Sequence, residues 1–182
     1  AQYAQNVYAI DIESDGADNA SIGGVSAIAL PNETRIGSPI YGQNITFDKL
    51  GALAFVPYRY PSSVAVLDVS PSETGDPNNL LLGFTEAGAS PTDVEVVELK
   101  TGQEVLYVSS ASRGQVYGYS LPDLQLITTI DVGRGAGDMV SVTHPESGQS
   151  RLYVSLFEEA GVAVVDVAPE SPWYHQLIAT IR

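Results

Sequence analysis

The chain has 182 residues, with 8 Lys and Arg against 22 Asp and Glu, and its net charge is -14. A surface this acidic repels phosphate backbones and anionic lipid, so we expect no nucleic-acid partner and no docking on acidic membranes. The lack of Cys excludes a disulfide framework, a thiolate metal site and a cysteine nucleophile. No apolar run approaches membrane-spanning length. Only 16% of residues are charged, and apolar residues alternate with polar ones, which predicts one all-β domain.

The N-terminal segment predicts an exported protein and a first group of strands. Residues 1–5 (AQYAQ) look like a start left by cleavage after a small residue. Residues 7–10 and 25–30 alternate with period two and predict two strands, and a third is expected near residues 35–36. We therefore expect the protein outside the cell, on its surface or in a periplasm.

The segment between these first two strands is acidic and resembles the start of a calcium loop. Oxygen-bearing side chains stand at its first, third and fifth positions, and Gly16 stands at the sixth. Ile22 occupies position twelve, where a bidentate Glu is usual. The alternative is a solvated acidic turn. The predicted Ca²⁺ ligands are Asp11, Glu13, Asp15, the carbonyl of Ala17, and Asn19.

Three N-x-S/T sequons lie in the first quarter of the chain, at Asn19, Asn32 and Asn44. Their clustering predicts N-glycosylation of a secreted protein. The alternative is that Asn, Ser and Thr share turns for conformational reasons. Asn19 cannot easily serve both a glycan and Ca²⁺, so the two hypotheses compete there.

A hairpin pattern then occurs three times without gaps, in residues 54–69, 106–121 and 152–167. Each copy contains two alternating strands around a polar loop. Corresponding Val residues at 56, 108 and 154 are 52 and 46 residues apart. A period near 45 residues with four strands per unit is typical of a β-propeller blade.

The fourth strand of the unit also recurs, since residues 126–130 match residues 177–181. Turns from Gly88 to Asp93 and from Gly133 to Asp138 lead into new strands. A further first strand is expected around residues 45–47. The predicted fold is a single β-propeller region, residues 1–182, with blades at about 1–40 (incomplete), 41–88, 89–133 and 134–182.

This order contains fifteen strands, one fewer than four complete blades. An open ring leaves strand edges and an apolar blade face uncovered. We therefore expect about four four-stranded blades that form part of a larger ring, or a ring that another chain completes.

Several of these segments resemble the YVTN-type β-propeller repeats of bacterial and archaeal cell-surface proteins and lactonase-like propellers. They are residues 106–110 (LYVSS), 152–155 (LYVS), 162–167 (VAVVDV) and 177–181 (LIATI), with the turn at Gly133. The resemblance extends from about residue 53 to the end and is weak before it. It implies a propeller fold, which hosts many activities.

No catalytic or organic-cofactor residues are assigned from the sequence. The two histidines, His144 and His175, belong to different blades and are expected at the surface. The sequence has no G-x-S-x-G elbow. The favoured function is a non-catalytic extracellular scaffold that binds protein partners or itself. The alternatives are a fragment of a propeller enzyme, lactonase-like or quinone-dependent dehydrogenase-like, and a structural protein that assembles into a filament or surface layer.

Overall fold

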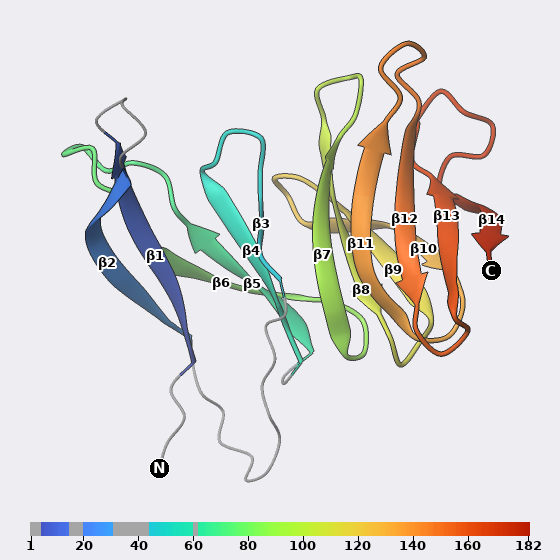
Figure 1. The fold of residues 1–182 in the computed structure, drawn as a ribbon, viewed down its shortest axis with the longest axis horizontal. Coiled ribbons are helices and arrows are strands. Elements are labelled where there is room, and N and C mark those ends of the chain that lie inside the picture. The colour runs from blue at the N-terminus through green and yellow to red at the C-terminus, as the bar shows by residue number, and fades with distance from the viewer. Residues whose placement is uncertain (1–4, 15–19, 31–43, 60–61) are drawn as a thin grey trace, which may run out of the picture.

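A computed structural model describes residues 5–14, 20–30, 44–59 and 62–182 (Figure 1). All of the regular elements described there are β-strands, which confirms the predicted all-β class. The first two, β1 (Gln5–Ser14) and β2 (Ala20–Leu30), form a two-stranded antiparallel sheet. The strand expected near residues 35–36 lies outside the described residues. Within the described ranges, no helix is long and apolar enough to cross a membrane.

Three antiparallel sheets of four strands follow, and in each the strands are paired in chain order. The second sheet contains β3 (Thr46–Phe47), β4 (Leu53–Tyr58), β5 (Ser63–Asp68) and β6 (Leu80–Glu86). The third contains β7 (Pro91–Glu98), β8 (Glu104–Ser110), β9 (Gln115–Ser120) and β10 (Gln125–Asp131). The fourth contains β11 (Ala136–Thr143), β12 (Ser150–Leu156), β13 (Gly161–Asp166) and β14 (Gln176–Ile181).

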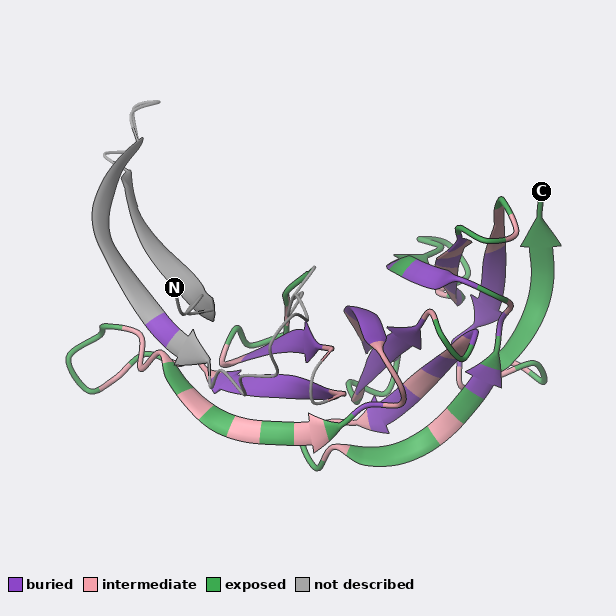
Figure 2. Cartoon of the chain, turned by 90° about the horizontal axis from the view of Figure 1, so that it is seen from below, coloured by how far each residue is buried: buried purple, intermediate pink, exposed green. Residues whose placement is uncertain are grey.

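The sheets stand side by side in an open arc (Figures 1 and 2). The first strand of each later sheet packs near the first strand of its neighbour, as β7 does with β3 and β11. The last strands, β6, β10 and β14, lie along the convex edge of the arc (Figure 2). This is the blade order of a β-propeller, with first strands at the inner edge and last strands at the outer edge.

The strand register confirms that the sequence repeat is a structural repeat. Val56 pairs with Ala65, Val108 with Tyr117, and Val154 with Ala163, so all three hairpins have the same register. The last strands also share a β-bulge, which leaves one extra residue unpaired in each at corresponding positions. These bulge residues are Leu82, Ile127 and Ile178.

Glycine is required in the links between sheets, as the two matched turns predict. Gly88 has a φ of 42° and Gly133 a φ of 123°, both in the region that favours glycine. A Cβ at Gly88 would also lie 2.2 Å from the ring of Tyr117. These links bring the chain from the outer edge of one sheet back to the inner edge of the next.

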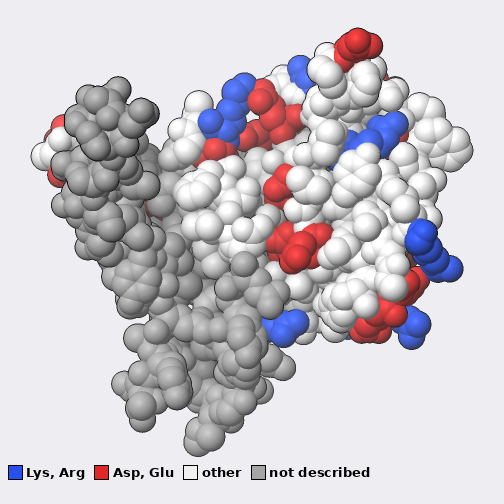
Figure 3. All heavy atoms as spheres, viewed as in Figure 1, with Lys and Arg blue, Asp and Glu red and all other residues white. Residues whose placement is uncertain are grey.

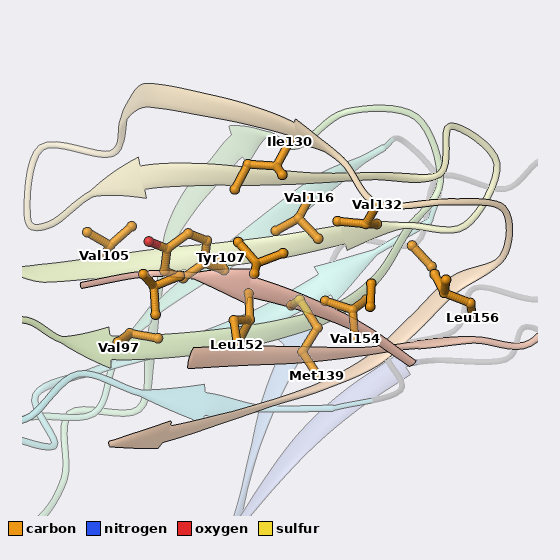
Figure 4. Close-up of a cluster of buried hydrophobic side chains, with 14 of the residues drawn as sticks. Val97, Val105, Tyr107, Val116, Ile130, Val132, Met139, Leu152, Val154 and Leu156 are labelled. Atoms are coloured by element: carbon orange, nitrogen blue, oxygen red, sulfur yellow. The ribbon is translucent and has the colours of Figure 1, made fainter. Parts of the chain in front are cut away.

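The core consists of layers between adjacent sheets. Leu106 and Val108 of β8 pack with Phe55 of the second sheet. Their neighbours in sequence, Val105 and Tyr107, belong to the core shared with the fourth sheet (Figure 4). Successive residues of a strand point to opposite faces, so β8 is buried from both sides. This explains the uninterrupted apolar run at residues 105–108 of β8.

One aromatic position shows how each sheet depends on the next. Phe55, Tyr107 and Tyr153 correspond in the three hairpins. Phe55 and Tyr107 are 0% exposed, because the following sheet covers them. Tyr153 is only half-buried, because it lies on the outer face of the fourth sheet. The aromatic side chain at this position is therefore part of the core in the second and third sheets and part of the surface in the fourth.

This difference predicts unequal costs for the same substitution. Tyr107→Ala should destabilise the protein by about 3–5 kcal/mol, because it leaves a cavity between two sheets. Tyr153→Ala should cost about 1 kcal/mol. Urea unfolding of the two variants measures the difference. Equal losses would contradict the stacking of the third sheet on the fourth.

Candidate functional site

The inner edge of the fourth sheet is held by carboxylates from the third. Strand β11 pairs with β12 on one side only, so the N–H groups along its other edge need other partners. The Met139 N–H donates to Asp93 Oδ2 at 2.5 Å. The Ser141 N–H and hydroxyl both donate to Glu95 Oε1, at 2.9 and 2.6 Å. Two side chains of β7 therefore take the place of a neighbouring strand.

Asp93 connects three sheets. Its second carboxylate oxygen accepts a hydrogen bond from Asn44 Nδ2, just before β3, at 2.7 Å. Its own N–H donates to Ser109 Oγ of β8 at 3.0 Å. The side chain is 2% exposed, and this burial raises the pKa of its carboxyl group, although the bonds from Asn44 and Met139 oppose the rise. Both oxygens are engaged, so this carboxylate serves as a clamp between sheets.

Asn44, Asp93 and Asp138 occupy corresponding positions. The strand register places Val94 opposite Val108 and Met139 opposite Val154, and each follows one of the aspartates. An irregularity at the start of β7 and β11 gives both aspartates the same backbone setting. Asp138 is exposed, and no hydrogen bond or ion pair to it occurs within the described residues. The matched spacings from Gly88 and Gly133 contain this signal, but the spacing alone does not indicate a role for the aspartates.

The predicted calcium loop falls mainly outside the described residues. Asp15, Ala17 and Asn19 are not described. Asp11 and Glu13 lie in β1, opposite Gly24 and Ser21, which corrects their placement in a loop. The strand extends through Ser14 because residues 12–14 pair with 20–22. In the described part of the chain, no group of three or more His, Asp or Glu side chains could hold a metal ion.

Two of the three sequons, at Asn19 and Asn32, also lie outside the described residues. Asn44 is described and exposed. Its amide nitrogen, the atom that would carry a glycan, donates to Asp93, and its oxygen accepts the Ile45 N–H at 2.8 Å. Asn44 therefore has a structural role at the inner edge, which the sequon pattern does not indicate.

His175 was expected at the surface, and the structure places it half-buried. Its Nε2 lies 2.9 Å from the hydroxyl of the buried Tyr107, and its ring stacks on Tyr174 at 3.7 Å. Partial burial lowers the pKa of His175 to about 4. The contact links the third sheet to the loop before β14. His144 is exposed, as expected.

The Asp93 clamp predicts a matched difference in stability. Asp93→Asn places an amide N–H against the N–H donor of either Asn44 or Met139, so we expect a loss of about 1–3 kcal/mol. Asp138→Asn, at the corresponding exposed position, should change stability by less than about 0.5 kcal/mol. Chemical denaturation checks both. If Asp93→Asn were as stable as the native chain, the clamp would have no energetic role.

His175 predicts a pH dependence of stability. Its folded-state pKa lies below the unfolded value of about 6.5, so the unfolded chain binds more protons between pH 6.5 and 4. Stability due to neutral His175 is therefore present above pH 6.5 and is lost as pH falls toward 4. His175→Asn, which tolerates the φ of 60° at this position, should flatten this decrease. Melting temperatures measured across that pH range test the difference, and parallel curves would count against it.

Comparisons with known proteins support the fold. No protein-family model matches the chain, and no curated protein matches it. Among solved structures, it is similar to Kuenenia stuttgartiensis hydrazine synthase, with 19% identity and a TM-score of 0.57 over 83% of this chain. It is also similar to the dihydro-heme d1 dehydrogenase NirN in complex with DHE, with 12% identity and a TM-score of 0.59 over 87%. The chain spans 38% and 30% of those proteins. At these identities the likeness shows the fold alone, which is that of part of a β-propeller.

Proposed function

We propose that the chain is a non-catalytic β-propeller scaffold of YVTN type that acts outside the cell and binds protein partners through its outer rim. The outer rim is the set of exposed apolar side chains on β6, β10 and β14. More than half of the exposed large apolar side chains in the described residues belong to it, and this concentration is the main support for the proposal. The rim contains Leu80, Leu82, Phe84, Leu126, Ile127, Leu177, Ile178 and Ile181.

The rim has a regular construction. Its central members, Leu82, Ile127 and Ile178, are the three bulge residues and are 59%, 44% and 39% exposed. A bulge interrupts the row of backbone donors and acceptors on an edge strand, which discourages unspecific strand pairing. It leaves the apolar side chains available. A repeated row of such side chains is a typical protein-binding surface.

Charge further defines the partner. The chain has a net charge of -14, and acidic side chains form separate groups on the face shown in Figure 3. An acidic partner would be repelled, so the proposed partner presents an apolar surface with neutral or basic surroundings. A second copy of the chain would meet this requirement only if the acidic groups stayed apart.

The hydrogen bonding of the polar side chains at the inner edge favours a scaffold over an enzyme. In propeller enzymes, polar side chains near the axis would have to remain available for substrate. Here Asp93 and Glu95 instead accept hydrogen bonds from β11. The similar structures include a synthase and a dehydrogenase by name, but a fold-level likeness does not transfer their activities.

Substitution of the three bulge residues tests the proposal. The native protein, with its partner bound to the rim, should have a molar mass by light scattering that exceeds the mass of one copy of the chain. The triple variant Leu82→Ser, Ile127→Ser and Ile178→Ser should lose the partner with its circular dichroism unchanged, because it removes apolar contact area. Leu50→Ser, an exposed apolar residue in the turn before β4, is the matched control.

A native particle of one copy, or a triple variant that keeps its partner, would contradict the rim proposal. Turnover of a lactone by the native protein would favour the enzyme alternative. Ca²⁺ at residues 11–19, with Asn19 as a ligand or else as a glycan acceptor but not both, and glycans at Asn32 or Asn44 belong to the same extracellular proposal. Intact mass of the native preparation, before and after chelation and deglycosylation, would reject them if it equals the mass of the bare chain throughout.

A further inference from the structure

The turn before the last strand is built alike in the third and fourth sheets, but its final residue differs. The strand register places Leu124, before β10, at the position of His175, before β14. Both have a positive φ, of 53° and 60°. The Leu124 N–H donates to the Ser120 carbonyl at 2.8 Å, and the His175 N–H donates in the same way to the Asp166 carbonyl at 2.8 Å. The two side chains therefore start from equivalent positions.

Both side chains lie at the interface with the preceding sheet, but they differ in chemistry. Leu124 packs against the core cluster that contains Phe55 of the second sheet. His175 instead places its Nε2 2.9 Å from the hydroxyl of Tyr107 of the third sheet. An apolar pair at one interface is thus replaced at the next by a polar pair, one member of which titrates. The fold does not require a histidine here, because Leu124 occupies the same position one sheet earlier.

The hydrogen bond between Tyr107 and His175 fits only the neutral imidazole. Tyr107 is fully buried, and its hydroxyl has no second hydrogen-bond partner among the residues that the structure describes. The O–H therefore donates and Nε2 accepts, because the reverse leaves a buried O–H without an acceptor. Burial raises the pKa of the Tyr107 and Tyr174 hydroxyls, so both rings stay neutral in acid. A protonated His175 can only donate through Nε2, which breaks this arrangement.

The charged groups near this turn have other partners. The Asp166 carboxylate, at the end of β13, is paired with Arg151 at 3.0 Å. Glu170, within the turn, is paired with Lys100 of the third sheet at 3.3 Å. This second pair is exposed, so it holds the turn only weakly. Protonated His175 forms no ion pair with either carboxylate in the described part of the chain, so acid weakens the attachment of the turn.

We propose that the Tyr107–His175 contact is a pH-sensitive switch, and that protonation of His175 releases residues 169–175 from the third sheet. The opening is local. The core shared by the third and fourth sheets contains aliphatic side chains, Met139 and Tyr107, and none of them gains charge in acid (Figure 4). The two sheets therefore stay stacked, while the turn and the start of β14 become free to move.

Native-state hydrogen exchange tests the switch in the native protein. A pKa of about 4 in the closed turn and about 6.5 in the open one predicts roughly 20-fold more opening at pH 5 than at pH 7. The protection factor of the His175 amide, corrected for the intrinsic exchange rate, should fall by this amount. The Leu124 amide, which makes the corresponding hydrogen bond, is the control and should keep its protection. No fall at His175, or an equal fall at Leu124 or in β8, would overturn the proposal.

A double variant supplies the matched substitution. Tyr107→Phe combined with His175→Leu copies the pair of Phe55 and Leu124, and Leu124 shows that leucine adopts the required φ. The residue-175 amide of this variant should keep its protection between pH 7 and pH 5. His144→Asn, at the exposed histidine, should retain the native fall. A double variant that still shows the fall would assign it to another group and overturn the proposal. Neither measurement involves the outer rim, so the proposed scaffold function is tested separately.

Discussion

The structure depends on the burial of each sheet between two neighbours. A four-stranded sheet with apolar residues on both faces cannot shield them alone, so stability requires stacking. Strand β8 shows this most clearly, since Leu106 and Tyr107 are adjacent in sequence, fully buried, and packed against different sheets. The alternating pattern of the chain and its tandem repetition are consequences of this constraint. It also explains why the repeat must occur several times.

Stacking of apolar faces does not by itself align the inner edges, and polar side chains do so here. The Asp93 carboxylate remains at a buried position, where desolvation disfavours its charge, because Asn44 and the Met139 N–H compensate. Asn44 and Asp93, which align the inner edges of the blades, lie near the propeller axis, where a propeller enzyme would place its catalytic side chains. At the outer edge, by contrast, β-bulges leave apolar side chains exposed.

The repeat allowed the three hairpins, the last strands at residues 126–130 and 177–181, and the links at Gly88 and Gly133 to be predicted, because these features follow from local alternation and turn chemistry. The last strand of the second sheet, β6, was not placed. The hydrogen bonds of Asp93 and His175 to other sheets could not be predicted, since they join residues 46 or more positions apart that only the stacking brings together. Asp11 and Glu13 were misplaced for a related reason. Acidic residues typical of a turn are held in β1 by pairing with the opposite strand, which their own sequence does not reveal.

Native-state hydrogen exchange tests the stacked arrangement most directly. Amides of β8 and β9, which neighbouring sheets cover on both sides, should exchange only through global unfolding. Amides of β13 and β14, whose sheet has one open face, should exchange through smaller openings and therefore faster. Equal protection in both sheets, or faster exchange in β8 than in β13, would contradict a propeller segment built from successively buried blades.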